Sequence, residues 1–300
     1  MTSICVIGDV MLDVVTSLEP YSLDEVRDLQ HVRRPIDLLP GGSGAMFALA
    51  AVGEGFEDVR LLAKVGADAK GETEADVAAQ LVLKQLERQG IETYTALDHE
   101  TPTGTVIIMY LPGEERLLVA EAGANSRFCP ADVNPAMERA VQDADVLFVS
   151  GYGLLDDVRA QALVHLMREA REAGALVVLD VVPHSIYKLM NLEAFLALTA
   201  SVHVIAAEVN TMKRLFLLGA DRLPESDAPI AKLADRLFDY YDAAILQPEL
   251  ARQVVVDRRG IIETLETGSG RLSPHQLRGF SERMIARSLL KHYPRLATAV

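Results

Sequence analysis

The amino-acid sequence predicts an α/β fold, with a doubly wound, mainly parallel central sheet flanked by helices and a small β-sheet lid. Two observations predict it. Short β-branched runs alternate with stretches of helical period, and two extended segments interrupt this alternation in the first half of the chain. Because no repeat, low-complexity tract or Gly/Ser linker divides the 300 residues, we expect one domain over residues 1–300.

Short apolar runs rich in β-branched residues supply the strands of the central sheet, and amphipathic stretches supply the crossover helices between them. The predicted strands are Ser3–Ile7, Val59–Lys64, Val146–Val149, Leu176–Asp180, Val202–Ile205 and Ala243–Leu246. The predicted helices are Gly44–Gly53, Glu72–Gln89, Asp157–Ala173, Leu192–Thr199, Val209–Leu218 and Ala228–Tyr241. This alternation is typical of parallel sheets with helices on both faces.

The small lid is predicted from the two insertions that break the alternation, at about residues 14–39 and 103–120. In the second insertion, Thr105–Leu111 and Arg116–Ala120 flank a Pro112-Gly113 turn signal, which predicts a β-hairpin. An exposed apolar hairpin favours pairing with a second copy, so a homodimer through the lid is expected.

Composition excludes several classes of partner. A formal net charge of −14 argues against nucleic acid and anionic membranes, which require clustered Lys and Arg. No apolar stretch approaches the roughly 20 residues of a membrane span, and the N-terminus lacks the pattern of a signal peptide. Cys5 and Cys129 lie far apart without metal-ligand spacing, which favours a reducing compartment. We expect a cytoplasmic protein that acts on a small molecule.

Motifs in the first half of the chain occur in a recognisable order. They are Gly8-Asp9-Val10-Met11-Leu12-Asp13, Gly41-Gly42-Ser43-Gly44-Ala45-Met46, Lys64-Val65-Gly66-Ala67-Asp68 and Thr101-Pro102-Thr103-Gly104-Thr105. In this order they resemble the ribokinase-like (PfkB) carbohydrate and nucleoside kinases. The resemblance implies the same fold, a β lid that often mediates dimers, and phosphorylation of a sugar or nucleoside hydroxyl with ATP and Mg²⁺.

Asp13 and Asp9 are candidate substrate-binding residues. A carboxylate at the end of a strand can accept hydrogen bonds from two vicinal hydroxyls, and open α/β sheets bind their ligands at that edge. Asp13 is the preferred candidate. The alternative for both residues is that they cap a turn.

Gly41, Gly42, Met46 and Thr105 complete the predicted substrate side. Paired glycines before a helix let the backbone approach a ligand closely, although a bare turn into the helix would need them equally. Met46 stands where the family usually has an Asn that binds substrate hydroxyls, and a thioether is at most a weak acceptor. Thr105 begins the lid strand that would help set specificity.

The catalytic turn is the main departure from the family. Such kinases need a base and preorganised N–H donors, which the family supplies in a Gly-Ala-Gly-Asp turn at a helix N-terminus. Gly279-Phe280-Ser281-Glu282, followed by a predicted helix Arg283–His292, is the preferred counterpart, with Glu282 as the base and Ser281 in place of a glycine. Glu282 could instead be a dipole-stabilised helix carboxylate. Thr267–Arg271 is the alternative segment, which would lack the base.

Other positions that contact magnesium, phosphate or nucleotide in the family also differ from the family pattern here. Glu208 is a candidate Mg²⁺ ligand, beside Asn210, but their order differs from the family's Asn-x-x-Glu. Leu246–Ala251 replaces a glycine-containing turn near the nucleotide. Asp180 is retained at the end of its strand, and His184 follows four residues later.

Two hypotheses remain from the sequence. The first is an active sugar or nucleoside kinase that uses Mg²⁺ and ATP, with degenerate catalytic motifs. The second is a catalytically inactive pseudokinase, or a ligand-binding or dimerising protein, on the same fold.

Overall fold

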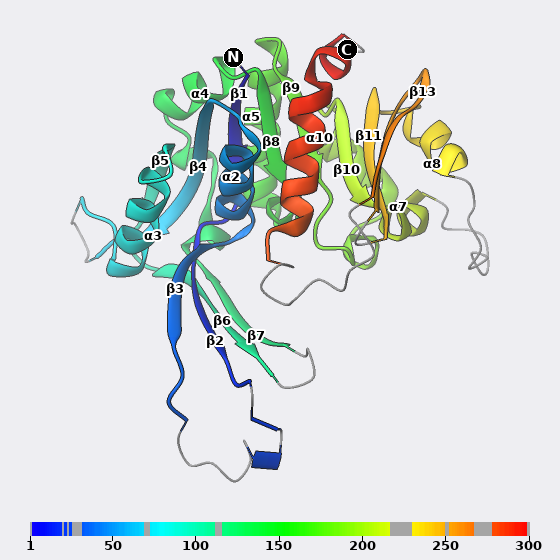
Figure 1. Ribbon diagram of the computed structural model, residues 1–300. Coiled ribbons are helices and arrows are strands. Elements are labelled where there is room, and N and C mark those ends of the chain that lie inside the picture. The colour runs from blue at the N-terminus through cyan, green and yellow to red at the C-terminus, as the bar shows by residue number, and fades with distance from the viewer. Residues whose placement is uncertain are drawn as a thin grey trace.

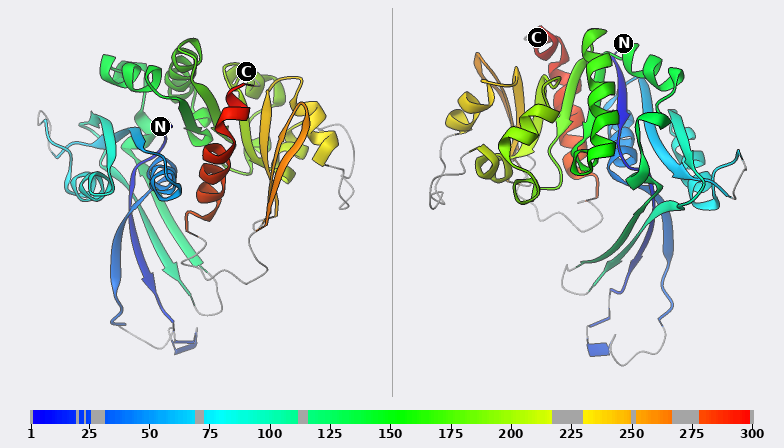
Figure 2. Two further views of the ribbon diagram at one scale, coloured as in Figure 1. Left: turned by 45° about the horizontal axis from the view of Figure 1, so that its top comes forward. Right: turned by 180° about the vertical axis from the view of Figure 1, so that it is seen from behind.

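A computed structural model describes residues 2–19, 21–22, 24–25, 32–68, 73–111, 116–216, 230–249, 252–266 and 278–298. Its strands form two separate sheets (Figure 1). A large sheet lies between layers of helices, and a small sheet projects from one edge of this body (Figure 2). The predicted fold class is confirmed.

The large sheet has nine strands in the order β13-β12-β11-β10-β9-β8-β1-β4-β5. Its strands are β1 Ser3–Ile7, β4 Asp58–Gly66, β5 Ile91–Asp98, β8 Val146–Ser150, β9 Leu176–Asp180, β10 Val204–Glu208, β11 Ala243–Glu249, β12 Arg252–Asp257 and β13 Gly260–Glu266. Neighbours from β5 through β11 pair in parallel, and β12 and β13 add an antiparallel edge. Strand order reverses between β1 and β8, where open α/β sheets place their ligands.

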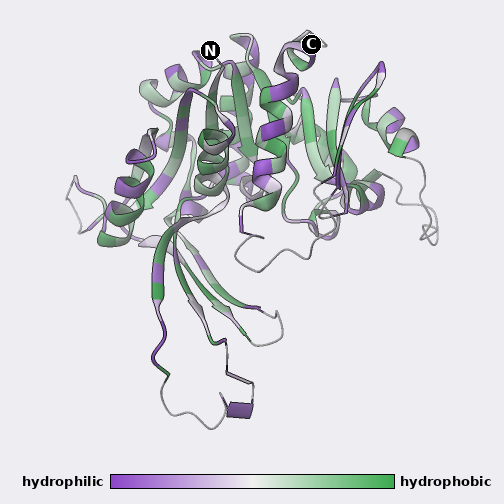
Figure 3. Cartoon of the chain, viewed as in Figure 1, coloured by the Kyte–Doolittle hydropathy of each residue, from purple (hydrophilic) through white to green (hydrophobic). Residues whose placement is uncertain are grey.

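Both faces of the large sheet are buried. In β1, Ile4 and Val6 join the apolar cluster on one face, whereas Cys5 and Ile7 join the cluster on the other. A strand covered on both sides has to be apolar at every position, which is why these strands are short continuous apolar runs. Figure 3 shows the same contrast between largely hydrophobic strands and helices with hydrophilic outer faces.

Helices divide between the two faces of the large sheet. The cluster that includes Cys5 and Ile7 contains residues of α4 Pro135–Gln142, α5 Asp157–Glu172, α6 Leu192–Leu198, α7 Val209–Phe216 and α8 Ile230–Leu237. The cluster that includes Ile4 and Val6 contains residues of α2 Ser43–Glu54, α3 Val77–Glu87 and α10 Phe280–Ala297. In the described part of the chain, no helix combines the length and apolar character needed to cross a bilayer.

The small sheet has the order β3-β2-β6-β7. Its strands are β2 Met11–Ser17, β3 Ile36–Gly41, β6 Thr103–Tyr110 and β7 Arg116–Gly123. The predicted hairpin strands β6 and β7 pair antiparallel, while its predicted Pro-Gly turn lies outside the described residues. The sheet is therefore built from the two extended segments that the sequence singled out.

Two predicted elements have different bounds in the structure. The helix predicted from Glu72 begins only at Val77, because the Asp76 carboxylate caps it by accepting the N–H of Ala79. The strand predicted at Val202–Ile205 is β10, which starts at Val204 and continues to Glu208. This extension matters because it carries the Glu208 side chain to the strand end where the site lies.

Other elements were missed or predicted too short. β5 was missed because it is an edge strand of the large sheet with a mostly half-buried sequence that shows no clear apolar run. α4 was missed because it is short, and it begins at Pro135 after the capping side chain of Asn134. The C-terminal helix predicted over Arg283–His292 extends from Phe280 to Ala297.

Candidate active site

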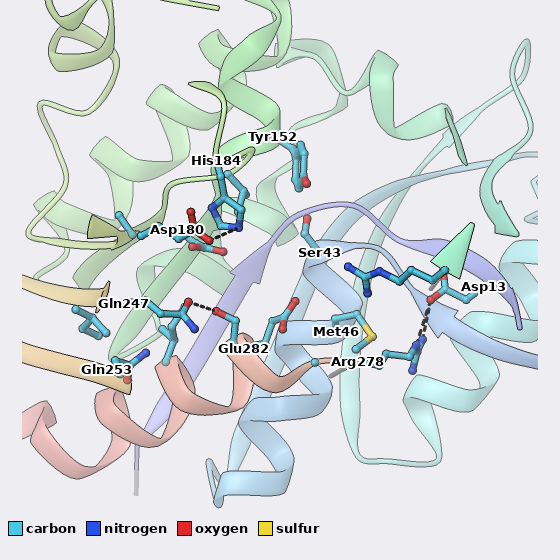
Figure 4. A pocket seen from close by; sticks show the side chains of 18 residues that line it. Asp13, Ser43, Met46, Tyr152, Asp180, His184, Gln247, Gln253, Arg278 and Glu282 are labelled. Carbon is cyan, nitrogen blue, oxygen red and sulfur yellow. Dashed lines mark hydrogen bonds and ion pairs between the residues drawn. The ribbon is translucent and has the colours of Figure 1, made fainter. Parts of the chain in front are cut away.

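A cavity of about 350 Å³ opens at the carboxyl ends of the parallel strands, between the large sheet, the small sheet and the start of α10. Its walls include Asp13, Ser43, Met46, Arg116, Tyr152, Asp180, Val182, His184, Ala207, Glu208, Ile245, Gln247, Gln253, Arg278, Gly279, Ser281, Glu282 and Ile285. Figure 4 shows Asp13 and Arg278 together at one side and Asp180 with His184 at the other. We call these the small-sheet side and the main-sheet side.

Asp13, the preferred substrate ligand from the sequence, lies in the wall on the small-sheet side and is 5% exposed. Its Oδ2 accepts hydrogen bonds from Nη2 and Nε of Arg278, at 2.9 and 3.3 Å. Burial raises the pKa of the Asp13 carboxyl, and the Arg278 guanidinium opposes that rise. The carboxylate therefore faces the cavity already paired with a cation.

Gly41 and Gly42 have no side chain, which leaves space for the Asp13 carboxylate and for the neighbouring backbone. A Cβ on Gly41 would lie 1.9 Å from Asp13 Oδ1, so only glycine leaves space for that carboxylate. Gly42 has φ of 85°, and a Cβ there would lie 2.4 Å from the carbonyl oxygen of Asp9. That carbonyl accepts N–H groups of Gly44 and Ala45 at the start of α2. The glycine pair thus supports the site indirectly, by letting β3 turn into α2.

Asp9 and Thr105 do not line this cavity. The Asp9 carboxylate pairs with Arg159 at 2.6 Å, on the face of the sheet where α5 packs. The Thr105 hydroxyl lies on β6, 3.5 Å from the carbonyl oxygen of Thr103. The structure therefore brings Asp13 to the cavity and leaves these two predicted ligands away from its walls.

The start of α10 carries the predicted catalytic turn. Gly279 is the N-cap residue, has φ of 68°, and offers no side chain to cap the first N–H groups. Ser281 donates to Oε1 of Gln247 at 3.1 Å, and Glu282 lies in the first turn and lines the cavity. Met46 faces the same turn, since a Cβ on Gly279 would lie 2.7 Å from its terminal methyl group. Uncapped N–H groups and a positive dipole end can receive an anion here.

Acidic side chains gather on the main-sheet side. Asp180 ends β9, Glu208 ends β10, and Glu282 faces them from α10. Burial, followed by the charges of Glu282 and Glu208, raises the pKa of the Asp180 carboxyl to about 8. Like charges that share one cavity wall favour a bound cation or a retained proton.

Glu208, the predicted metal ligand, lines the cavity and lies 3.4 Å from Nε2 of His184. No group of three or more His, Cys, Asp or Glu among the described residues is arranged to hold a metal ion by itself. Oxygen donors of this kind suit Mg²⁺, which usually keeps several waters and takes only one or two protein carboxylates. The donor set therefore fits Mg²⁺ that arrives with a phosphate ligand.

Two further segments were predicted to differ from the family pattern, Thr267–Arg271 and Leu246–Ala251. Thr267–Arg271, the alternative catalytic segment, lies outside the described residues. At the other position, β11 continues through Pro248 to Glu249 and pairs with β10 and β12, with a register shift between Leu246 and Glu249. A strand therefore occupies residues 246–249, where the family pattern led us to look for a turn.

Sequence reasoning missed several side chains of the cavity, among them Arg116, Tyr152 and Arg278. Tyr152 follows the buried strand β8 by two residues, so the rule that ligands bind at strand ends could have found it. Arg278 immediately precedes the predicted catalytic turn and was overlooked because its partner is 265 residues away in the sequence. Nothing in the local pattern marks Arg116, at the first position of β7.

Solved structures of similar fold support this architecture. Adenosine kinase from Trypanosoma brucei brucei has a TM-score of 0.77 at 16% identity, and the match covers 99% of this chain and 96% of that one. Ribokinase from Giardia lamblia has a TM-score of 0.67 at 15% identity, covering 99% of this chain and 89% of that one. Adenosine kinase from Sinorhizobium meliloti has a TM-score of 0.71 at 17% identity, covering 99% and 90%. At these identities the likeness shows the fold alone.

Sequence comparisons provide the family assignment. No curated protein sequence matches this chain significantly. The model of the pfkB family of carbohydrate kinases matches residues 1–216, which is more than half of the 300 residues. The matched part contains the small sheet, β1 and the strands that end in Asp180 and Glu208. The chain therefore belongs to the pfkB carbohydrate kinase family.

Proposed function

We propose that this protein transfers the γ-phosphoryl group of Mg·ATP to a hydroxyl of a sugar or nucleoside bound in the cavity. One observation carries the proposal: the uncapped N-terminus of α10 and the Glu282 carboxylate line the same cavity as Asp13. A base, donors for a developing negative charge and a carboxylate for hydroxyl groups are the parts that this reaction needs.

Each part has a defined task in the proposed reaction. Asp13 accepts hydrogen bonds from substrate hydroxyls, and Glu282 takes the proton of the attacking hydroxyl. Backbone N–H groups at the start of α10 donate to the phosphoryl oxygens, where the helix dipole favours negative charge. Glu208, with Asp180 beside it, would hold Mg²⁺ in part, and the ion would supply positive charge that neutralises the phosphates.

A second candidate is a pseudokinase that binds a small molecule without phosphorylating it. Asp13 is already paired with Arg278, Met46 stands at the family's Asn position, and β11 lacks the glycines expected near a nucleotide. Glu282 is one methylene longer than the usual Asp, and an error of about 1 Å in the position of a base can cost on the order of 10²-fold in rate. These departures favour lost or altered catalysis.

Thermal shift and a coupled ADP-release assay separate the two candidates. Sugars and nucleosides are screened with and without Mg·ATP, because a ligand that binds only the folded state raises the melting temperature. Stabilisation by Mg·ATP, with ADP release that Glu282→Gln abolishes, supports the kinase. A response to a sugar or nucleoside with none to any nucleotide at millimolar concentration would contradict it and favour the pseudokinase.

We also propose that two copies pair through the small sheet. In register across β3, β6 and β7, Leu38, Ile107 and Val119 lie on one face and are 43–55% exposed. Ile36 and Leu117 extend the same exposed apolar face. Light scattering should give the mass of a dimer, and Val119→Glu should give a monomer with an unchanged melting temperature in dilute solution. A monomeric wild type would contradict the proposal.

The remaining parts of the proposal concern domain organisation, location and partners. We propose a single domain over residues 1–300, with the small sheet as its lid. We place it in the cytoplasm, without nucleic acid or membrane partners, because its net charge is −14 and its two cysteines are free. Fractionation of cells that express the tagged protein tests the location.

A further inference from the structure

Among the described residues, two arginines line the cavity, and both belong to the small-sheet side. Arg116 begins β7 of the small sheet, and Arg278 is bound to Asp13 of β2. The whole chain carries a net charge of −14, so guanidinium groups that converge on one cavity are not a general property of its surface. Their shared position in one cavity wall indicates that they contact a ligand.

Among the described residues, only the Arg278 side chain has a hydrogen-bond or ion-pair partner. Arg278 donates to the Asp13 carboxylate and also to the carbonyl oxygen of Pro40, and its side chain is 22% exposed. The Arg116 side chain has no hydrogen-bond or ion-pair partner among the residues that the structure describes. The small-sheet side therefore holds two cations against one carboxylate, Asp13.

A neutral ligand would leave the positive charge on the small-sheet side uncompensated. Hydroxyls that bind Asp13 compete with Arg278, and a ligand that fills the cavity buries that guanidinium without giving it a charged partner. An anionic group removes this cost because a guanidinium donates two parallel hydrogen bonds to a carboxylate or phosphate. The same ligand could still present its hydroxyls to Asp13.

We propose that Arg116 and Arg278 form a subsite for a carboxylate or phosphate on the substrate, while Asp13 binds its hydroxyls. The substrate is then an acidic sugar, either a sugar acid or a sugar phosphate, and not a neutral sugar or nucleoside. This inference rests on the proposed function, since it names the substrate class of the same cavity.

Matched ligands test the subsite directly. Ribose, ribonate and ribose 5-phosphate, with glucose, gluconate and glucose 6-phosphate, are titrated by calorimetry in the absence of nucleotide. At least one acidic member should bind at least about tenfold more tightly than its neutral parent, and more weakly at high salt. Preference for the carboxylate or the phosphate members identifies the anion.

Variants link the preference to the two arginines. Arg116→Gln lies on an exposed strand, so it should fold normally and weaken the acidic ligand by about tenfold or more. Arg278→Lys keeps the charge next to Asp13 but loses the planar fork, and it should also weaken that ligand. Arg168→Gln, on the exposed face of α5, is the matched control and should bind as the wild type does.

Several outcomes overturn this inference. It fails if a neutral member binds as tightly as its acidic partners, if Arg116→Gln binds as the wild type does, or if no acidic member binds. These outcomes are distinct from failure of the proposed function. An acidic sugar that binds but is never phosphorylated contradicts the kinase alone, whereas phosphorylation of a neutral sugar in preference to its acidic partners contradicts the subsite alone.

Discussion

The two sides of the cavity are built differently. On the small-sheet side, the Asp13 carboxylate is matched by the Arg278 guanidinium at 2.9 Å, with a second arginine in the wall. On the main-sheet side, Asp180, Glu208 and Glu282 face one another, and the half-exposed His184 is the only basic group beside them among the described residues. A balanced pair suits ligand recognition, whereas uncompensated like charges favour a cation or a shifted proton. This contrast assigns binding to one side and chemistry to the other.

Of the substitutions considered, Glu282→Gln should have the largest effect, and that effect should be on kcat. If the main-sheet side performs the chemistry, loss of the base should lower kcat by about 10²–10⁴-fold and leave affinity for the sugar ligand nearly unchanged. Steady-state kinetics with calorimetry separates the two quantities. Equal losses in kcat and in sugar affinity would show that Glu282 contributes to binding. That result would contradict the assignment of binding to one side of the cavity and chemistry to the other.

Asp13→Asn should show the opposite pattern. An amide keeps the shape but loses the charge that attracts hydroxyl donors, so ligand affinity should fall by about 10–100-fold. Once ligand saturates the site, kcat should change much less than in the Glu282 variant. Calorimetry measures the affinity, and a variant whose kcat falls while its affinity is retained would contradict the assignment of binding to this side.

Asp180→Asn should raise stability at neutral and alkaline pH. The folded protein holds a proton on Asp180 up to pH about 8, whereas the unfolded chain releases it near the ordinary value of 3.8. The unfolded state therefore binds fewer protons in this interval, and this group makes the wild type less stable as pH rises from about 4 to about 8.

Denaturant titration across that pH interval measures the effect. The Asn variant should lack this loss and gain about 1–2 kcal/mol in free energy of unfolding at pH 8.5, a value discounted for the contact between Asp180 and solvent. Glu172→Gln, at an exposed carboxylate of α5, is the control and should follow the wild type. Parallel curves for the wild type and the Asn variant would contradict the raised pKa.

Ser281→Ala should have the smallest effect. It removes one hydrogen bond to Gln247, which links α10 to β11 at 3.1 Å. Because the cavity lets water replace the lost partner, the free energy of unfolding should fall by no more than about 1 kcal/mol. A larger loss in a melting experiment would mean that this contact fixes the start of α10 and supports both sides of the cavity.

Local sequence patterns predicted β1, β4 and β8 to β11 of the large sheet because these strands are buried on two apolar faces, as the alternation along Ile4, Cys5, Val6 and Ile7 shows. The predicted ligand Asp13 and the predicted base Glu282 both line the cavity, and both could be singled out because strand ends and helix starts are recognisable locally. Arg278 could not be predicted in the same way, since its role depends on a partner brought from β2. Asp9 was predicted as a substrate ligand because it also follows a strand, but its carboxylate pairs with Arg159 on the face of the sheet that α5 covers.

The packing of α10 against α2 has a consequence for synthesis of the protein. Ile285 and Leu289 of α10 join the same buried cluster as α2, and Arg287 pairs with Glu54 at 2.8 Å. On the ribosome, the apolar surface of α2 emerges more than 200 residues before the helix that covers it. The part of the α2 surface that α10 covers therefore stays exposed until the last helix has been synthesised, and it is a defined apolar segment for chaperones to protect.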